Sequence, residues 1–539
     1  MADDTNITNN TDYDVIIIGA GHNGLVTAGY LAKAGRRVLV LERRDQVGGA
    51  AVTEEVFPGF RFSTCADGSG YLCEEVRRDL EPQVESFAVD PVVFAPQPDG
   101  SHLAIWRDPA KTATEIARFS RADAERYPAF IELARKIAAV VGGLARVEPP
   151  ELPDVTLRDL LNLRPLAGPV RALGRKHIND LLRVLPMPVA DLLDEWFESD
   201  VVKGAIAANG VRDLTWGPKE AGTAYALLYN WSLSDTGLFR SAGGIKGGIG
   251  ALSDALAASA RGFGAEIRTA ARVEGIATED GRAVGVKLAG EGTLRAPVVV
   301  SNADPRTTFL ELLDPYTLGA KFVRHVRNIK YRGSAARVLL ALSEAPEFSA
   351  LASHGAGNGG DDPASLLQSP IQIAPTLTYL QRAYDCVKYG EYSPHPYLDV
   401  MIPTLLDPSL APAGQHVMSI TAKYAPYQLR DGDWNSRREA FGDVVVDTLS
   451  EYAPKIRDAI LHRRVLTPLD LEAAYGLPEG NPSHGEMTLD QFFHMRPIPG
   501  YARYRTPIGG LYLCGAGCHP GGGVTGIPGF NAARAILSD

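Results

Sequence analysis

The chain has 539 residues, of which 45% are hydrophobic and 22% charged, and its formal net charge is −10. This length exceeds what one hydrophobic core supports, so two or more structural units are expected. The acidic balance excludes a general nucleic-acid-binding protein, which would carry a basic patch, and five cysteines are too few for a disulfide framework.

The N-terminal segment, MADDTNITNNTDYD, is acidic and polar, without the basic region and apolar core of a signal peptide. It also lacks the arginines of a mitochondrial transit peptide. No apolar run approaches the roughly 18 residues that span a bilayer. These features predict a cytoplasmic protein, and peripheral contact with a membrane stays open.

The first predicted unit is a strand, a glycine-rich turn, a helix and a second strand. Residues 14–19 (DVIIIG) and 36–42 (RRVLVLE) are apolar runs typical of buried parallel strands, and the turn between them fits G-x-G-x-x-G. Such glycines let a pyrophosphate approach a helix N-terminus, and an acid about 20 residues later accepts hydrogen bonds from a ribose. The alternative is a tight turn without a ligand. The sequence predicts a dinucleotide site formed by Gly19, Ala20, Gly21, His22, Asn23, Gly24 and Glu42.

A second glycine pair, Gly48-Gly49, follows this unit. Here the chain resembles the flavin-dependent amine oxidase and phytoene desaturase superfamily, whose members follow the acid with a basic residue and a V-G-G turn beneath FAD. Amine oxidases usually have Arg after the pair, whereas this chain has Ala50, which favours the other branch. The resemblance adds Arg43, Gly48, Gly49 and Ala50 to the cofactor-binding residues.

Residues 96–240 are mainly helical in pattern and show no catalytic constellation. Helical spacing is found in residues 122–141 and 189–210. The stretch 184–211 is the candidate for contact with a bilayer, although its acidic residues weigh against anionic lipid. Four aromatic residues suit either an apolar tunnel or the core: Tyr225, Tyr229, Trp231 and Phe239.

Glycine-rich turns return in residues 241–304. Residues 243–250 open a helix, residues 272–288 are typical of a hairpin that turns at Asp280-Gly281, and a buried strand ends in SNADP. In the resembled family this block rejoins the FAD domain, Val273 faces the adenine, and the strand ends beneath the cofactor. The alternative is that these glycines only shape turns.

Residues 311–490 mix short predicted strands, such as 336–343 and 416–424, with loops. The segment 353–367 is a flexible loop by composition, a lid being one option. His484 and Glu486 lack the P-C-x-x-C of a zinc deaminase, and Cys514 and Cys518 have no second pair to complete a site. No metal site is predicted.

The chain ends as it begins, with a strand (LYLC), a glycine-rich loop (515–529, GAGCHPGGGVTGIPG) and a helix. Bare backbone before a helix N-terminus suits an anionic or electron-rich ligand, so one cofactor with two ends explains both glycine clusters. The loop resembles the C-terminal signature of bacterial phytoene desaturases, G-x-x-x-H-P-G-x-G-x-x-G. The matching residues are Gly515, His519, Pro520, Gly521, Gly523 and Gly526.

The resemblance covers nearly the whole chain and is strongest to a subgroup of phytoene-dehydrogenase relatives, the "pyridine nucleotide-disulfide oxidoreductase domain-containing protein 2"-like proteins. It implies an α/β fold: a Rossmann-like FAD/NAD(P)-binding domain with an inserted mixed α+β substrate domain. We predict FAD-domain segments 12–95, 241–310 and 491–539, and substrate-domain segments 96–240 and 311–490. The C-terminal loop is expected to contact FAD through Gly515, Ala516, Val524, Thr525 and Gly526.

The subgroup's name suggests a pyridine nucleotide and a redox disulfide. The chain has no second G-x-G-x-x-G in a βαβ unit and no C-x-x-C pair. A second NAD(P) site is therefore not supported by the sequence.

The implied function is that of an FAD-dependent dehydrogenase, desaturase or saturase. It would move hydride between an apolar, isoprenoid-like substrate and N5 of a noncovalent flavin, with a quinone, oxygen or another carrier as electron acceptor. His519 is the candidate proton donor or acceptor, or it fixes the glycine loop. Cys518 beside it either meets the flavin or is a small loop residue. Two alternatives stay open: an amine oxidase-like flavoenzyme, and a flavoprotein acting mainly as a binding or regulatory partner of another protein.

Overall fold

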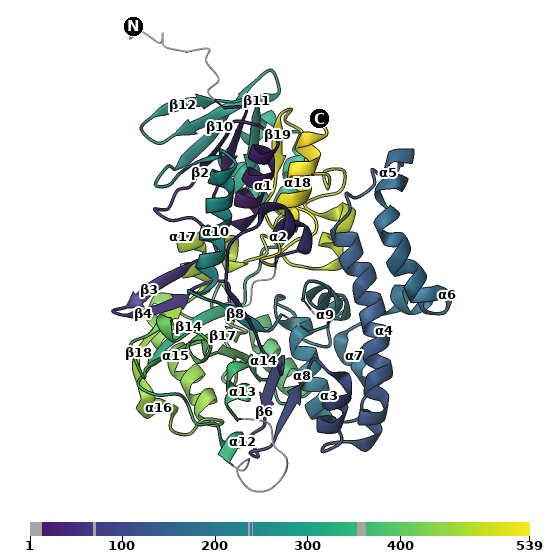
Figure 1. The fold of residues 1–539 in the computed structure, drawn as a ribbon, viewed down its shortest axis with the longest axis vertical. Coiled ribbons are helices and arrows are strands. Elements are labelled where there is room, and N and C mark those ends of the chain that lie inside the picture. The colour runs from purple at the N-terminus through teal and green to yellow at the C-terminus, as the bar shows by residue number, and fades with distance from the viewer. Residues whose placement is uncertain (1–12, 68–71, 236–237, 240, 353–362) are drawn as a thin grey trace.

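A computed structural model describes residues 13–67, 72–235, 238–239, 241–352 and 363–539. Figure 1 shows two sheets stacked along the long axis, with a layer of helices beside them. The N- and C-terminal elements share the upper sheet, and the middle of the chain forms most of the lower one. Of the predicted loop 353–367, residues 353–362 lie outside the described residues, and α13 (Pro363–Gln368) follows them.

The upper sheet is entirely parallel and has five strands. In spatial order they are β19 (Leu511–Leu513), β13 (Val298–Ser301), β1 (Val15–Ile18), β2 (Val38–Leu41) and β9 (Glu266–Arg268). Every residue of β1 and β2 is buried, as expected for a parallel sheet covered on both faces. The predicted Rossmann-like fold, and the strands at 14–19, 36–42, 298–301 and 511–514, are confirmed.

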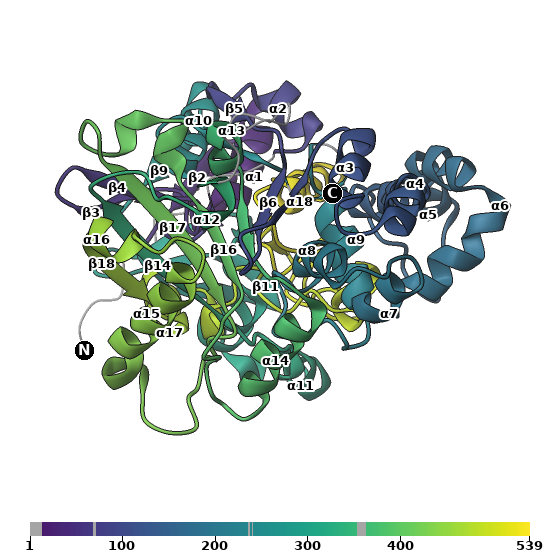
Figure 2. The same ribbon diagram turned by 90° about the horizontal axis from the view of Figure 1, so that it is seen from below.

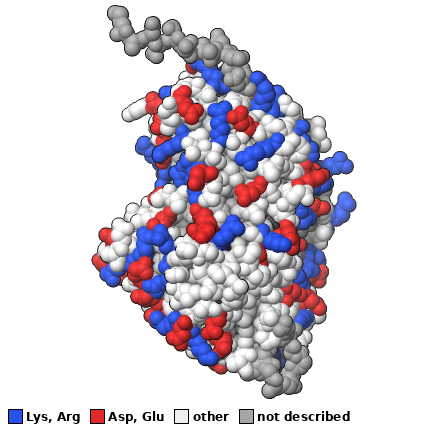
Figure 3. All heavy atoms as spheres, turned by 60° about the vertical axis from the view of Figure 1, so that its left-hand side comes forward, with Lys and Arg blue, Asp and Glu red and all other residues white. Residues whose placement is uncertain are grey.

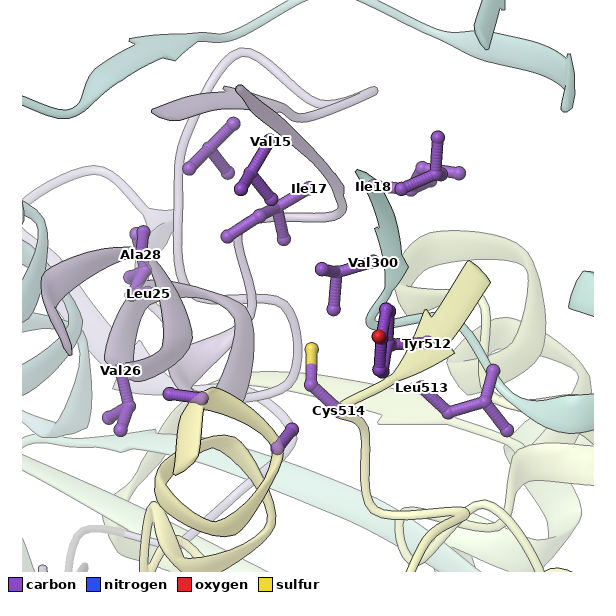
Figure 4. Close-up of a cluster of buried hydrophobic side chains, with 14 of the residues drawn as sticks. Val15, Ile17, Ile18, Leu25, Val26, Ala28, Val300, Tyr512, Leu513 and Cys514 are labelled. Carbon is purple, nitrogen blue, oxygen red and sulfur yellow. The ribbon is translucent and has the colours of Figure 1, made fainter. Parts of the chain in front are cut away.

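Three helices cover this sheet: α1 (His22–Lys33), α10 (Ile249–Gly262) and α18 (Ile527–Leu537). Figure 4 shows Leu25 and Ala28 of α1 beside Val15 and Ile17 of β1, and Cys514 among apolar side chains. α1 and α18 pack so closely that a Cβ on Gly529 would lie 2.2 Å from the carbonyl oxygen of Asn23. The first and last segments of the chain therefore form one core.

The predicted hairpin is present as β10 (Val273–Glu279) and β11 (Arg282–Leu288), with β12 (Gly292–Arg295) as a third strand. Asp280 and Gly281 have φ values of +47° and +73°, the conformation that Asp-Gly favours in a two-residue hairpin turn. Two further two-stranded sheets join β3 (Thr53–Phe57) to β4 (Phe60–Ser63) and β5 (Ser86–Ala88) to β8 (Gly243–Ile245).

The lower sheet has seven strands. Their order is β18 (Ile460–Leu466), β14 (Ala335–Leu342), β17 (His416–Lys423), β16 (Leu398–Met401), β15 (Ile371–Ile373), β6 (Val93–Pro96) and β7 (His102–Ile105). β14 and β17 confirm the strands predicted at 336–343 and 416–424. β6 and β7 reach this sheet from the N-terminal part of the chain, and the predicted domain limits stay a prediction.

The helical layer contains α4 (Arg121–Ala145), α7 (Val189–Asp194), α8 (Asp200–Val211) and α9 (Thr223–Ser232). The pattern at 189–210 thus forms two helices, separated at residues 195–199. The other helices are α2 (Glu74–Leu80), α3 (Pro109–Ile116), α5 (Leu157–Asn162), α6 (Ala167–Val184), α11 (Ala320–Asn328), α12 (Ser349–Ala352), α14 (Leu377–Lys388), α15 (Trp434–Ser450), α16 (Ile456–Ala459) and α17 (Pro468–Tyr475).

Apolar side chains of the stretch 184–211 pack into the core of the helical layer. Large exposed apolar side chains lie instead on the neighbouring arm of α5 and α6, where Leu157 is 74% and Leu182 is 66% exposed. Figure 2 shows this arm beside α4, to one side of the sheets. No helix of the described residues is long and apolar enough to cross a membrane. Basic and acidic side chains lie interspersed on the face in Figure 3.

Candidate functional site

The glycine-rich loops at the two ends of the chain meet at one edge of the upper sheet. β1 lies next to β13, and β13 lies next to β19, all parallel, so the loops that follow them leave the sheet on the same side. Asn302, which follows β13, donates from Nδ2 to the carbonyl oxygen of Gly19 at 3.4 Å. Its Oδ1 lies 3.9 Å from the Sγ of Cys514. Asn302 thus links both loops.

The first loop requires glycine because of its close contacts. Gly19 has a φ of +91°, and a Cβ on Gly24 would lie 2.3 Å from the Gly19 carbonyl oxygen. The second pair lies against it: the Gly48 N–H donates to the Ala20 carbonyl oxygen at 2.8 Å. A Cβ on Gly49 would lie 3.2 Å from the Cα of Gly21. Two layers of bare backbone therefore surround the N-terminus of α1.

Glu42 follows β2 and is 6% exposed. One carboxylate oxygen accepts the Ala20 N–H at 2.8 Å, and the other accepts the Arg44 N–H at 3.0 Å. These bonds orient the carboxylate toward the glycine loop and leave lone pairs on both oxygens. The geometry suits a ribose diol, and it also braces the loop itself.

A cavity of about 480 Å³, the first cavity, lies at this edge of the sheet. Most of the predicted cofactor-binding residues line it: Gly19, Gly21, His22, Asn23, Glu42, Arg43, Gly48, Gly49, Ala50, Val273 and Ala516. Ala20 and Gly24 lie behind this lining. The buried Nδ1 of His484, on the cavity wall, has no hydrogen-bond partner among the described residues. Such an unpaired polar atom is expected where a ligand binds.

A second cavity, of about 240 Å³, continues from the first and shares His22, Ala50, Pro482 and Ala516 with it. Val524 and Thr525 of the C-terminal loop line it. Gly515 and Gly526 do not: a Cβ on Gly515 would lie 2.7 Å from the Asn302 carbonyl oxygen, and Gly526, with a φ of +72°, precedes α18. The two loops thus contribute to adjoining cavities.

Of the four aromatic residues considered as a tunnel, only Tyr229 lines the second cavity. Its hydroxyl donates to the Gly522 carbonyl oxygen at 3.1 Å, which ties α9 to the C-terminal loop. Tyr225 packs behind it, with ring centroids 5.9 Å apart. Trp231 and Phe239 pack against each other in the core of the helical layer, their centroids 4.6 Å apart.

Several cavity residues were not predicted from the sequence. Arg306 and His484 line the first cavity, and Arg212, Arg337 and Lys423 line the second. The available signal was a basic residue inside an otherwise apolar strand, as in ARVLLALS and SITAKY. Burial of such a side chain requires a polar partner, but the pattern does not show which.

His519 lies outside the lining of both cavities. It is fully buried, its Nε2 lies 3.0 Å from the Leu144 carbonyl oxygen, and its ring packs edge-on against Phe493. Burial lowers its pKa to about 4, so the ring is neutral at pH 7. This position favours loop fixation over proton transfer.

His519→Gln is expected to make the protein less sensitive to acid. The unfolded state, with a histidine pKa near 6.5, binds a proton that the folded state excludes, so the free energy of unfolding falls as pH drops from about 6.5 to 4, by up to about 1.4 kcal/mol per pH unit and group. Urea unfolding at pH 7.5, 6 and 5 measures this slope, with the exposed His395→Gln as control. An unchanged slope, with substrate-driven flavin reduction lost, would instead assign His519 to catalysis.

All five cysteines are free, and Cys514 and Cys518 are buried. Burial raises the pKa of Cys514 to about 12 and that of Cys518 well above its usual value, so both thiols are protonated. Within the described residues, no cluster of three or more His, Cys, Asp or Glu side chains has metal-binding geometry.

The two cavities together fit an elongated dinucleotide with a ring at one end. The first offers bare backbone, a helix N-terminus and a carboxylate, which suit the pyrophosphate and ribose, and the second begins where the C-terminal loop suits a flavin ring. The profile of the family described as "Flavin containing amine oxidoreductase" matches residues 24–537.

Similar proteins extend over almost the whole chain. Pyridine nucleotide-disulfide oxidoreductase domain-containing protein 2 of Rattus norvegicus is 37% identical, over 98% of this chain and 94% of that protein. A limonene dehydrogenase chain of Castellaniella defragrans is 30% identical, over the same shares. A neurosporene-forming phytoene desaturase of Cereibacter sphaeroides is 26% identical, over 97% and 94%. The chain belongs to the flavin-containing amine oxidoreductase family and is an FAD-dependent oxidoreductase.

Proposed function

We propose that this enzyme is a dehydrogenase, desaturase or saturase whose substrate is predominantly apolar and isoprenoid-like. The observation that carries the proposal is the second cavity, because it adjoins the cofactor cavity and is lined by the C-terminal loop, the lower sheet and the helical layer. Apolar side chains from three parts of the chain line it: Leu214, Leu233 and Met487. A substrate there would lie beside the flavin ring.

Two relatives support this substrate class, since limonene and phytoene appear in their names. The sequence adds Ala50 at the position where amine oxidases usually have Arg, and H-P-G-G-G in the C-terminal loop. Both features favour the desaturase branch over an amine substrate.

Bound FAD supplies a two-electron centre that accepts or donates hydride at N5. The chain's own residues position this centre: the glycine loops offer backbone N–H groups, and Glu42 offers a carboxylate. Tyr225 and Phe492, with ring centroids 4.8 Å apart, pack behind Tyr229 and exclude water from that side. Electrons would pass to a quinone, oxygen or another carrier.

The test begins with the visible spectrum of the purified protein, before and after denaturation and filtration. We expect oxidised-flavin bands that pass the filter, because Cys518 and His519, the candidate attachment points, lie outside the cavity lining. Under anaerobic conditions limonene or geraniol should bleach these bands, or phytoene should reoxidise the reduced flavin. Bleaching by putrescine alone would contradict the proposal.

A further inference from the structure

The face of the lower sheet at the second cavity carries two buried cations. β14 and β17 are antiparallel neighbours, with Ala335 opposite Lys423 and Arg337 opposite Thr421. Directly opposite residues share a face, and residues two apart return to it. Arg337 and Lys423 therefore lie on one face; both line the second cavity, and they are only 5% and 3% exposed.

The Lys423 ammonium group donates to the Leu214 carbonyl oxygen at 2.9 Å and to the Ser334 hydroxyl at 3.2 Å. It has three N–H donors, so one is left for the cavity. It forms no ion pair with a carboxylate of the described residues. Burial lowers its pKa to about 8, with Asp213 acting in the opposite direction, and the group is mostly protonated at pH 7.

Arg337 donates to the Thr421 hydroxyl, and to the Ser63 carbonyl oxygen at 3.2 Å. Its buried Nε has no hydrogen-bond partner in the part of the chain that the structure describes, and the side chain has no carboxylate partner there. A guanidinium group stays charged in a protein interior. Its burial is unfavourable unless an anion or a full set of acceptors compensates.

Other charged side chains around the second cavity are already paired. The pairs are Arg212 with Asp67, Arg212 with Asp399, and Arg332 with Glu486. Asp213 also lines the cavity, where its charge opposes that of an incoming anion. Lys423 and Arg337 thus offer donors on one wall, and Asp213 sets a limit on how much negative charge the cavity accepts.

We propose that the second cavity binds a substrate whose apolar body ends in a carboxylate, and that Lys423 and Arg337 hold this carboxylate. Hydrogen bonds between ionised partners are roughly twice as strong as neutral ones, and the apolar lining is left to contact the body. The proposal rests on the proposed function, because it takes the second cavity as the substrate site. It adds a polar end that a plain hydrocarbon lacks.

The test compares binding of decanoate, decan-1-ol and decylamine to the FAD-loaded protein by isothermal titration calorimetry at pH 7. Decanoate should bind about tenfold more tightly than decan-1-ol. Lys423→Met and Arg337→Met should each remove most of this preference, and Asp213→Asn should strengthen decanoate binding. Lys246→Met is the matched control, because Lys246 is exposed and pairs with Glu85 at the surface, and it should change nothing.

Methionine is chosen because replacing a buried charge by an apolar side chain is often neutral or stabilising. FAD content and thermal unfolding show whether each variant is folded; should Lys423→Met lose FAD, Arg337→Met and Asp213→Asn carry the comparison. Equal binding of decan-1-ol or decylamine, or an unchanged preference in the folded methionine variants, overturns the proposal. Flavin reduction by an isoprenoid without any decanoate preference contradicts the carboxylate site alone, whereas the preference without such reduction contradicts the proposed function alone.

Discussion

Gly24→Ala is expected to purify with about a tenth or less of the wild-type FAD content. The added Cβ would lie 2.3 Å from the Gly19 carbonyl oxygen, a separation that real structures do not hold. The clash moves the first turn of α1 away from β1, and this turn carries the N–H groups for the pyrophosphate. Overpacking of this kind costs about 1–3 kcal/mol, and about 1.4 kcal/mol is tenfold in affinity.

The control is Gly262→Ala, another helical glycine, whose added Cβ would have no neighbour within 4 Å. It should keep its FAD and gain up to about 1 kcal/mol in stability. Gly515→Ala examines the other loop, since its Cβ would lie 2.7 Å from the Asn302 carbonyl oxygen. Absorbance ratios of flavin to protein, with circular dichroism as the measure of folding, decide the result. Full FAD content in a folded Gly515→Ala would break the explanation that one cofactor joins both loops.

The upper sheet and its loops were predictable because their determinants are local. A strand buried on both faces is a continuous apolar run, and a tight turn against a helix needs glycine, so residues 14–24 contain the signals for their own structure. The same holds for the Asp280-Gly281 hairpin. The resemblance then joined the two ends of the chain into one site, which local patterns alone do not do.

The second cavity was not predictable in the same way. Arg212, Arg337 and Lys423 come from α8's end, β14 and β17, and their meeting depends on strand order and register that no single segment encodes. A buried base in an apolar strand signals a partner but not its identity. Conversely, His519 has the residue type of a catalytic group, and only its packing against Leu144 and Phe493 shows a place for it away from the cavities.

Arg212→Met is expected to lower the free energy of unfolding by about 3–5 kcal/mol, the range for removing one partner of a buried ion pair. The Arg212 side chain joins two parts of the fold. Its Nε donates to Asp399 of β16 at 2.9 Å, and its Nη2 donates to Asp67, which follows β4. Asp399 is only 4% exposed, so without the guanidinium group its carboxylate lies buried with less compensation. Urea unfolding at pH 7 measures the loss.

The double variant Arg212→Met with Asp399→Asn should recover at least half of that loss, because the uncompensated charge is removed with its partner. A loss below about 1 kcal/mol in Arg212→Met would place the pair among surface ion pairs of small effect. The same single variant also tests the charge balance of the second cavity. Asp67 and Asp399, no longer held by Arg212, add negative potential near Lys423 and Arg337, so decanoate should bind more weakly to Arg212→Met. Asp399→Asn in the same protein should restore part of that binding, since the carboxylate site depends on the whole set of charges around it.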